Sequence, residues 1–109
     1  MGLQAHSRQT IARQVKLRNS FRNGNVSAIR YNAGETPHIG VLPSFLTDQL
    51  KGTSRNNDTY VVYSYQTPIG WSNCDGRDEW FIPDVTYSIT TTHHQTLLKV
   101  ITGTSVYDG

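Results

Sequence analysis

The sequence predicts an α+β fold, in which a small antiparallel sheet packs with short helices. Residues 60–67 and 84–92 alternate in period two, which is typical of strands. Residues 44–51 and 93–101 combine apolar spacing with the end signals of short helices. At 109 residues the chain has the size of one domain.

Composition limits the core and the compartment. Hydrophobic residues make up 36% of the chain, so the core must be modest. The single cysteine, Cys74, excludes an intramolecular disulfide and fits a reducing compartment. No run approaches the roughly 18 apolar residues of a membrane span, and the first residues lack the apolar core of a signal peptide. We therefore expect a cytoplasmic protein that does not enter a membrane.

Charge is distributed unevenly along the chain. Residues 1–34 carry six basic residues and no acidic one, whereas residues 35–109 carry four basic and eight acidic residues. A basic segment on an acidic body can attract nucleic acid, or it can dock on the chain's own acidic part. The six candidate nucleic-acid contacts are Arg8, Arg13, Lys16, Arg18, Arg22 and Arg30. We expect a basic N-terminal arm or helix over residues 1–18, one α+β domain over 19–103 and a tail over 104–109.

The first half of the chain predicts two helices and a hairpin. A helix is expected over 7–18, with a narrow apolar stripe that would be marginal in isolation. Asn23-Gly24 predicts a tight turn and therefore a short hairpin within 20–30. After Pro43, residues 44–51 form an amphipathic pattern that Gly52 would end.

The second half predicts the main sheet, with strands over 60–67, 69–72, 79–82 and 84–92. Tyr63, Tyr65 and Tyr87 share parity with aliphatic residues, which favours a place in the core. Alternatively, these rings lie on the surface, where they could stack on bases or contact a protein partner. Two further aromatic residues, Trp71 and Trp80, belong to the same group.

The end of this sheet predicts a polar site. Thr92-His93-His94-Gln95 has the pattern of a capping box, so a strand would end at Thr92 and a helix would run over 93–101. Free backbone N–H groups at such a helix start favour a phosphate or carboxylate. The candidate ligand-binding residues are Ser88, Thr90, Thr91, Thr92, His93, His94 and Gln95. Capping without a ligand is the simpler alternative.

Catalytic and metal chemistry have weaker support. His93 or His94 could act as a general acid or base, but adjacent residues at a junction point in different directions. No C-x-x-C or H-x-x-x-H spacing occurs, so we predict no metal site and no cofactor. Cys74 lies in a polar turn, and a nucleophilic role for it is not supported.

One long pattern extends over the second half of the chain. It consists of Tyr60-x-Val62-Tyr63-Ser64-Tyr65-x-Thr67-Pro68-Ile69-x-Trp71 and then Trp80-x-Ile82-Pro83-Asp84-Val85-x-Tyr87-Ser88-x-Thr90-Thr91-x-x-His94-Gln95. It resembles a family of small uncharacterised proteins of bacteriophages and related mobile elements. The resemblance covers about residues 18 to 99. It implies a phage origin and action in the cytoplasm of a host bacterium, and it transfers no catalytic residue.

These observations predict a small non-enzymatic phage-type accessory protein. Its expected partner is a host protein or a small phosphate-bearing, nucleotide-like ligand, and self-association is an additional option for so small a core. The first alternative is a DNA- or RNA-binding protein that uses the basic N-terminal segment. The second alternative is a small histidine-dependent hydrolase or nuclease.

Overall fold

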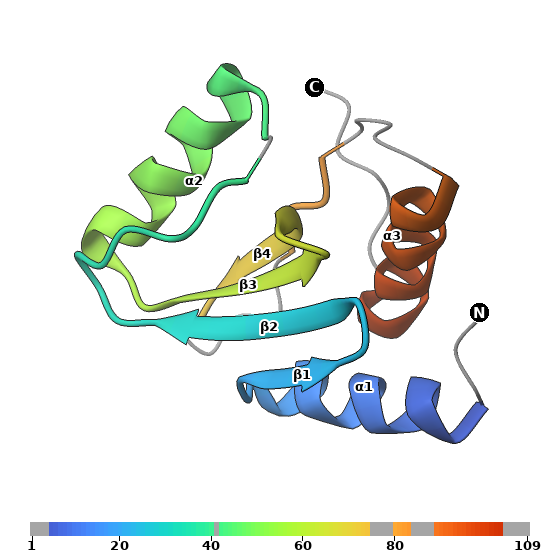
Figure 1. The fold of residues 1–109 in the computed structure, drawn as a ribbon. Helices are drawn as coiled ribbons and strands as arrows, with labels where there is room; N and C mark the ends of the chain where they lie inside the picture. Colours follow the sequence, from blue (N-terminus) through green and yellow to red (C-terminus); the bar gives the residue numbers. More distant parts are fainter. Residues whose placement is uncertain (1–4, 41, 75–79, 84–88, 104–109) are drawn as a thin grey trace.

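The computed structural model describes residues 5–40, 42–74, 80–83 and 89–103. Within them a four-stranded antiparallel sheet has helices on both faces (Figure 1), which confirms the α+β class. In chain order the elements are α1 (Ala5–Leu17), β1 (Phe21–Asn23), β2 (Val26–Tyr31), α2 (Ser44–Asn56), β3 (Thr59–Ser64), β4 (Thr67–Asn73) and α3 (Ile89–Thr102). The strands follow one another across the sheet in the order β1-β2-β3-β4.

The sheet consists of two hairpins, β1–β2 and β3–β4. The hairpin predicted within 20–30 is confirmed as β1 and β2, which pair from Phe21↔Ala28 to Asn23↔Val26. Its turn is formed by Gly24 and Asn25, one residue later than the Asn-Gly pair alone would indicate. Gly24 takes the positive φ, 64°, that the first position of a type II′ turn requires.

The second hairpin corrects the expected strand over 60–67. β3 ends at Ser64, the chain reverses at Tyr65 and Gln66, and β4 pairs back from Ser64↔Thr67. The alternating pattern runs on through the turn without a glycine or asparagine to mark it, which is why the pattern hides the reversal. The expected strand over 69–72 lies within β4, where a bulge opposite Val62 and Tyr63 leaves Ile69 outside the register.

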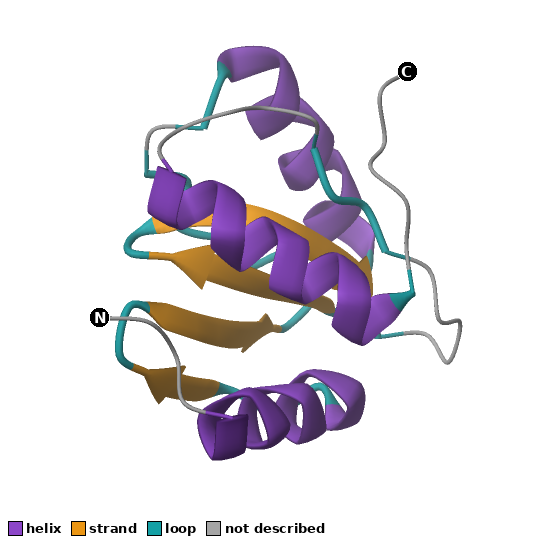
Figure 2. Ribbon diagram, turned by 90° about the vertical axis from the view of Figure 1, so that its right-hand side faces the viewer, coloured by secondary structure: helices purple, strands orange, loops and turns teal. Residues whose placement is uncertain are grey.

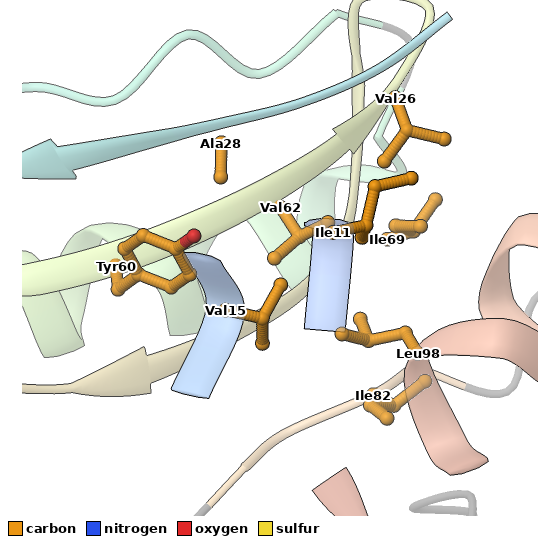
Figure 3. Close-up of a cluster of buried hydrophobic side chains, with 9 residues drawn as sticks. All are labelled: Ile11, Val15, Val26, Ala28, Tyr60, Val62, Ile69, Ile82 and Leu98. Atoms are coloured by element: carbon orange, nitrogen blue, oxygen red, sulfur yellow. The ribbon is translucent and has the colours of Figure 1, made fainter. Parts of the chain in front are cut away.

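Helices lie on both faces of the sheet (Figure 2). α1 and α3 cover one face, where the apolar cluster of Figure 3 consists of Ile11, Val15, Val26, Ala28, Tyr60, Val62, Ile69, Ile82 and Leu98. α2 covers part of the other face, with a cluster of Leu42, Leu46, Leu50, Val61, Tyr63 and Trp71. Ile11 and Val15 are each 1% exposed, so the basic N-terminal segment supplies part of the core.

The two predicted N-terminal helices are present with shifted bounds. α1 covers the helix expected over 7–18 within a residue or two. α2 begins at Ser44 as expected but passes through Gly52 to Asn56. Gly52 does not end the helix because the buried stripe of Leu46, Leu50 and Ser54 continues past it.

The helix α3 overturns the expected strand over 84–92 where that segment is described. Residues 84–88 lie outside the described residues, and Ile89 to Thr92 form the first turn of α3 instead of a strand end. Packing against β4 favours a helix here despite the local β propensity. α3 lies so close to β4 that a Cβ added at Gly70 would be 2.5 Å from Leu98 Cδ2.

The expected strand over 79–82 is reduced to a single bridge. Residue 79 lies outside the described residues, and Phe81 pairs with Trp71 of β4 through two backbone hydrogen bonds of 3.0 and 2.9 Å. The two rings stack at 4.8 Å between centroids. Pro83 two residues later is also a bridge residue, but it cannot donate a ladder hydrogen bond, and residues 80–83 form no continuous strand.

Candidate ligand-binding pocket

The helix start predicted at Thr92 is not where α3 begins. Thr92 lies at the fourth position of the helix, and its carbonyl accepts a hydrogen bond from Thr96 Oγ1 at 3.0 Å. Gln95 is 5% exposed and donates from Nε2 to the Pro83 carbonyl at 3.0 Å, so it does not return to cap the helix. Thr90 and Thr91 belong to the first turn, and Ser88 lies outside the described residues. The free backbone N–H groups of the helix start therefore belong to Ile89 through Thr92, and a ligand role for these residues stays a prediction.

The two predicted histidines separate. His93 is exposed, whereas His94 is half-buried, with Nδ1 2.7 Å from Ser64 Oγ. Burial of the ring, and then the neighbouring charge of His93, lowers the pKa of His94 below its ordinary value of 6.5. A serine–histidine pair can activate a nucleophile, but Ser64 is only 1% exposed. The geometry therefore favours a structural connection between β3 and α3.

The basic residues divide between different parts of the surface. Arg13 and Lys16 are exposed and three residues apart on α1, so they share one side of the helix. Arg8 also belongs to α1. Arg30 is exposed on β2, and Arg22 lies on β1 with its side chain toward the opposite face of the sheet from Phe21. The six candidates therefore do not form one continuous strip.

Three of these cations meet at a pocket of about 460 Å³ between the C-terminal ends of α1 and α3. Lys16, Arg18 and Arg30 line it, and no described lining residue is acidic. The remaining lining residues are Val15, Leu17, Asn73, Cys74, Trp80, Ile101 and Thr102. We call this the basic pocket.

Arg18 reaches the basic pocket through an unusual backbone conformation. Its N–H donates to the Val15 carbonyl at 3.1 Å and the Asn19 N–H donates to the Gln14 carbonyl at 2.9 Å, which is the hydrogen-bond pattern of a Schellman helix end. Arg18 occupies the left-handed position of this motif with a φ of 56°, where glycine is usual. The guanidinium lies 5.1 Å from the Trp80 ring centroid and donates to Ser72 Oγ at 3.0 Å. These two contacts hold the charge in place.

A buried tyrosine, Tyr60, contacts both the end of α1 and Trp80. Tyr60 is fully buried, its hydroxyl donates to the Asn19 carbonyl at 2.8 Å, and its ring meets Trp80 edge-on at 5.9 Å. Burial raises the pKa of Tyr60 well above its ordinary range; the charge of Arg18 opposes this shift and Cys74 adds to it. Tyr60 therefore remains a neutral hydroxyl donor that fixes the end of α1.

The charge balance of the basic pocket favours an anion. The C-terminal ends of α1 and α3 each contribute roughly half a negative charge. Three cations from Lys16, Arg18 and Arg30 exceed that sum, which leaves about two positive charges among the described groups. Its volume of about 460 Å³ is within the size range of small-molecule sites.

Sequence reasoning identified the cations of this pocket but missed its other walls. The sequence marks Trp80 only as an aromatic residue within the strand expected over 79–82, and Cys74 only as a turn residue. Asn73 has no signal of its own in the sequence; its Oδ1 atom is buried, and none of the described residues forms a hydrogen bond with it. Among the described residues no cluster of histidine, cysteine, aspartate or glutamate could hold a metal ion. None of the described helices is long and apolar enough to cross a membrane.

A family model matches residues 35–105, which is more than half of the chain, and its description is "Family of unknown function (DUF8033)". The match includes α2, β3, β4 and α3, whereas the three cations of the basic pocket precede it. No curated protein and no solved structure matches the chain.

Proposed function

The chain belongs to the DUF8033 family, whose function is unknown, and we propose that it is a small non-enzymatic protein that binds a phosphate-bearing ligand in the basic pocket. The convergence of Lys16, Arg18 and Arg30 on one cavity supports this proposal. The phage origin and the bacterial host remain predictions from the resemblance.

Arg18 is the group best prepared for such a ligand. A guanidinium presents several N–H donors in a fixed plane, which suits phosphate oxygens. Its stacking on Trp80 and its bond to Ser72 reduce the side-chain entropy that binding would otherwise cost. Lys16 and Arg30 are exposed and supply charge from α1 and β2.

Calorimetry with inorganic phosphate, adenosine monophosphate and adenosine triphosphate tests the proposal. Lys16→Gln combined with Arg30→Gln should weaken binding about tenfold or more, since one charge-assisted hydrogen bond contributes roughly 1.5 kcal/mol or more. Both residues are exposed, so the fold should be retained. Lys51→Gln combined with Arg55→Gln on α2 removes the same charge elsewhere and should leave binding unchanged. No binding of any of these anions by the wild-type protein would contradict the proposal.

Nucleic acid is the second candidate, because Arg13 extends the positive charge of α1 beyond the residues that line the pocket. Arg13→Gln should weaken binding of a thymidine oligonucleotide but not of adenosine monophosphate. The logarithm of the binding constant should also fall with the logarithm of salt concentration, with a slope of about −2 to −3 for three to four phosphate contacts. Point substitutions are preferable to removing residues 1–18, because Ile11 and Val15 belong to the core.

A further inference from the structure

The face of the sheet that carries α2 is only partly covered. α2 packs on β3 and β4, and it therefore lies toward the edge of the sheet opposite to β1 (Figure 1). Over β1 and β2 a second pocket of about 410 Å³ remains, which we call the sheet groove. Ile29 of β2 lies in it and is 42% exposed, and Arg22 of β1 is exposed beside it.

One wall of the sheet groove is held by two tyrosine hydroxyls. Tyr63 donates to the His38 carbonyl at 2.7 Å, its oxygen is 2.7 Å from that of Tyr31, and the His38 N–H donates to Tyr31 at 3.2 Å. These bonds attach the segment before α2 to β2 and β3. The wall is therefore formed before any ligand arrives, which lowers the entropic cost of binding.

The rim of the sheet groove contains a residue whose conformation is costly. Tyr65 has a φ of 59°, a region that a bulky side chain rarely occupies. The turn is held by the Tyr65 N–H, which donates to the Asn25 carbonyl at 2.6 Å. Glycine would satisfy the same turn without the strain. The ring is 52% exposed, and its one described aromatic neighbour is His94 at 6.3 Å, so burial does not offset the cost.

We propose that the sheet groove binds an extended peptide segment of a partner protein, with an acidic side chain next to an apolar one. Arg22 would pair with the acid, and no described lining residue of the groove is acidic. Ile29, which is 42% exposed, would receive the apolar side chain. Tyr65 would close over it, because tyrosine and arginine are the side chains that most often dominate the energy of protein interfaces. This site is independent of the basic pocket.

A random-peptide display library presented to the full chain tests this proposal. Selected peptides should share an acidic residue beside an apolar one. Arg22→Glu should weaken them about tenfold or more and should itself select peptides with a basic residue. Tyr65→Gly should also weaken them about tenfold or more while the melting temperature stays equal to or above that of the wild type. Arg55→Glu and Phe45→Ser, both at exposed positions of α2, are the matched controls and should bind normally.

Several results would overturn the proposal. Selected peptides that bind Arg22→Glu and Tyr65→Gly as well as the wild type would exclude the groove. A lower melting temperature in Tyr65→Gly would show that the ring serves the fold. Failure to select any peptide, together with concentration-dependent dimers lost in Ile29→Ser, would assign the groove to a second copy. Lys16→Gln with Arg30→Gln should leave peptide binding intact, so the two sites are tested separately.

Discussion

The end of α1 and the β3–β4 turn each place a non-glycine residue in a left-handed backbone conformation, but the two side chains have different surroundings. Arg18 and Tyr65 are the two described non-glycine residues with positive φ, at 56° and 59°. A left-handed conformation costs a residue with a side chain roughly 1–2 kcal/mol. Arg18 is stacked on Trp80 and bonded to Ser72, whereas the ring of Tyr65 is half exposed.

The difference lies in whether contacts of the side chain offset the strain of the backbone. The contacts of Arg18 explain why a strained arginine is acceptable at the end of α1, and they also orient a charge at the basic pocket. Tyr65 has no comparable set of described contacts, which is why its conformation points toward a binding role. Similar backbone angles therefore support different inferences.

The largest expected effect comes from Gly40, which lies close against the β3–β4 turn. Gly40 has a φ of 52°, and a Cβ added there would lie 2.2 Å from the Gln66 carbonyl oxygen. Gly40→Ala should lower the free energy of unfolding by about 3 kcal/mol or more, because backbone strain adds to a clash with backbone. Urea unfolding followed by circular dichroism measures this.

Gly24 provides the matched control for that substitution. It has a φ of 64° at the β1–β2 turn, but an added Cβ meets nothing within 4 Å. Gly24→Ala should therefore cost only the conformational energy, about 1–2 kcal/mol. Equal losses at the two glycines would show that the chain around Gln66 relaxes to accept the added Cβ without cost.

An intermediate effect is expected at Arg18. Arg18→Gly relieves strain of roughly 1–2 kcal/mol but removes a cation–π contact worth roughly 0.5–2 kcal/mol and a charged hydrogen bond worth roughly 1.5–3 kcal/mol. A net loss of about 2 kcal/mol, the difference between the centres of these ranges, should follow and is measured by urea unfolding. Tyr65→Gly should show no loss in the same experiment. A more stable Arg18→Gly variant would remove the distinction between the two sites.

The sequence predicts the fold class, the first hairpin and the presence of the helices, because these depend on local signals. Gly24 marks one turn, whereas Tyr65-Gln66 gives no such signal and conceals the other. Alternation over 84–92 predicts a strand, yet the contact of α3 with Gly70 of β4 decides for a helix where the segment is described. Contacts distant in sequence determine such outcomes, and local patterns do not contain them.

The basic pocket illustrates the same limit. Its cations are visible in the sequence as an excess over residues 1–34, but their convergence depends on β2 returning beside the end of α1. Trp80 joins them through a segment about fifty residues further along. Conversely, the polar run from Thr90 to Gln95 is continuous in sequence, and the helix distributes its side chains to different surroundings.

The smallest expected effect concerns His94, which connects α3 to the last residue of β3 before the Tyr65 turn. Its pKa is lowered in the folded chain, so between that value and 6.5 the unfolded chain binds more protons. Stability should be fully present above pH 7 and should decline as the pH falls through 6.5. His94→Gln should remove this part of the decline, as shown by urea unfolding of both proteins from pH 8 to 5.5. Identical pH profiles would mean that the partial burial of His94 against β3 does not disfavour its protonated form.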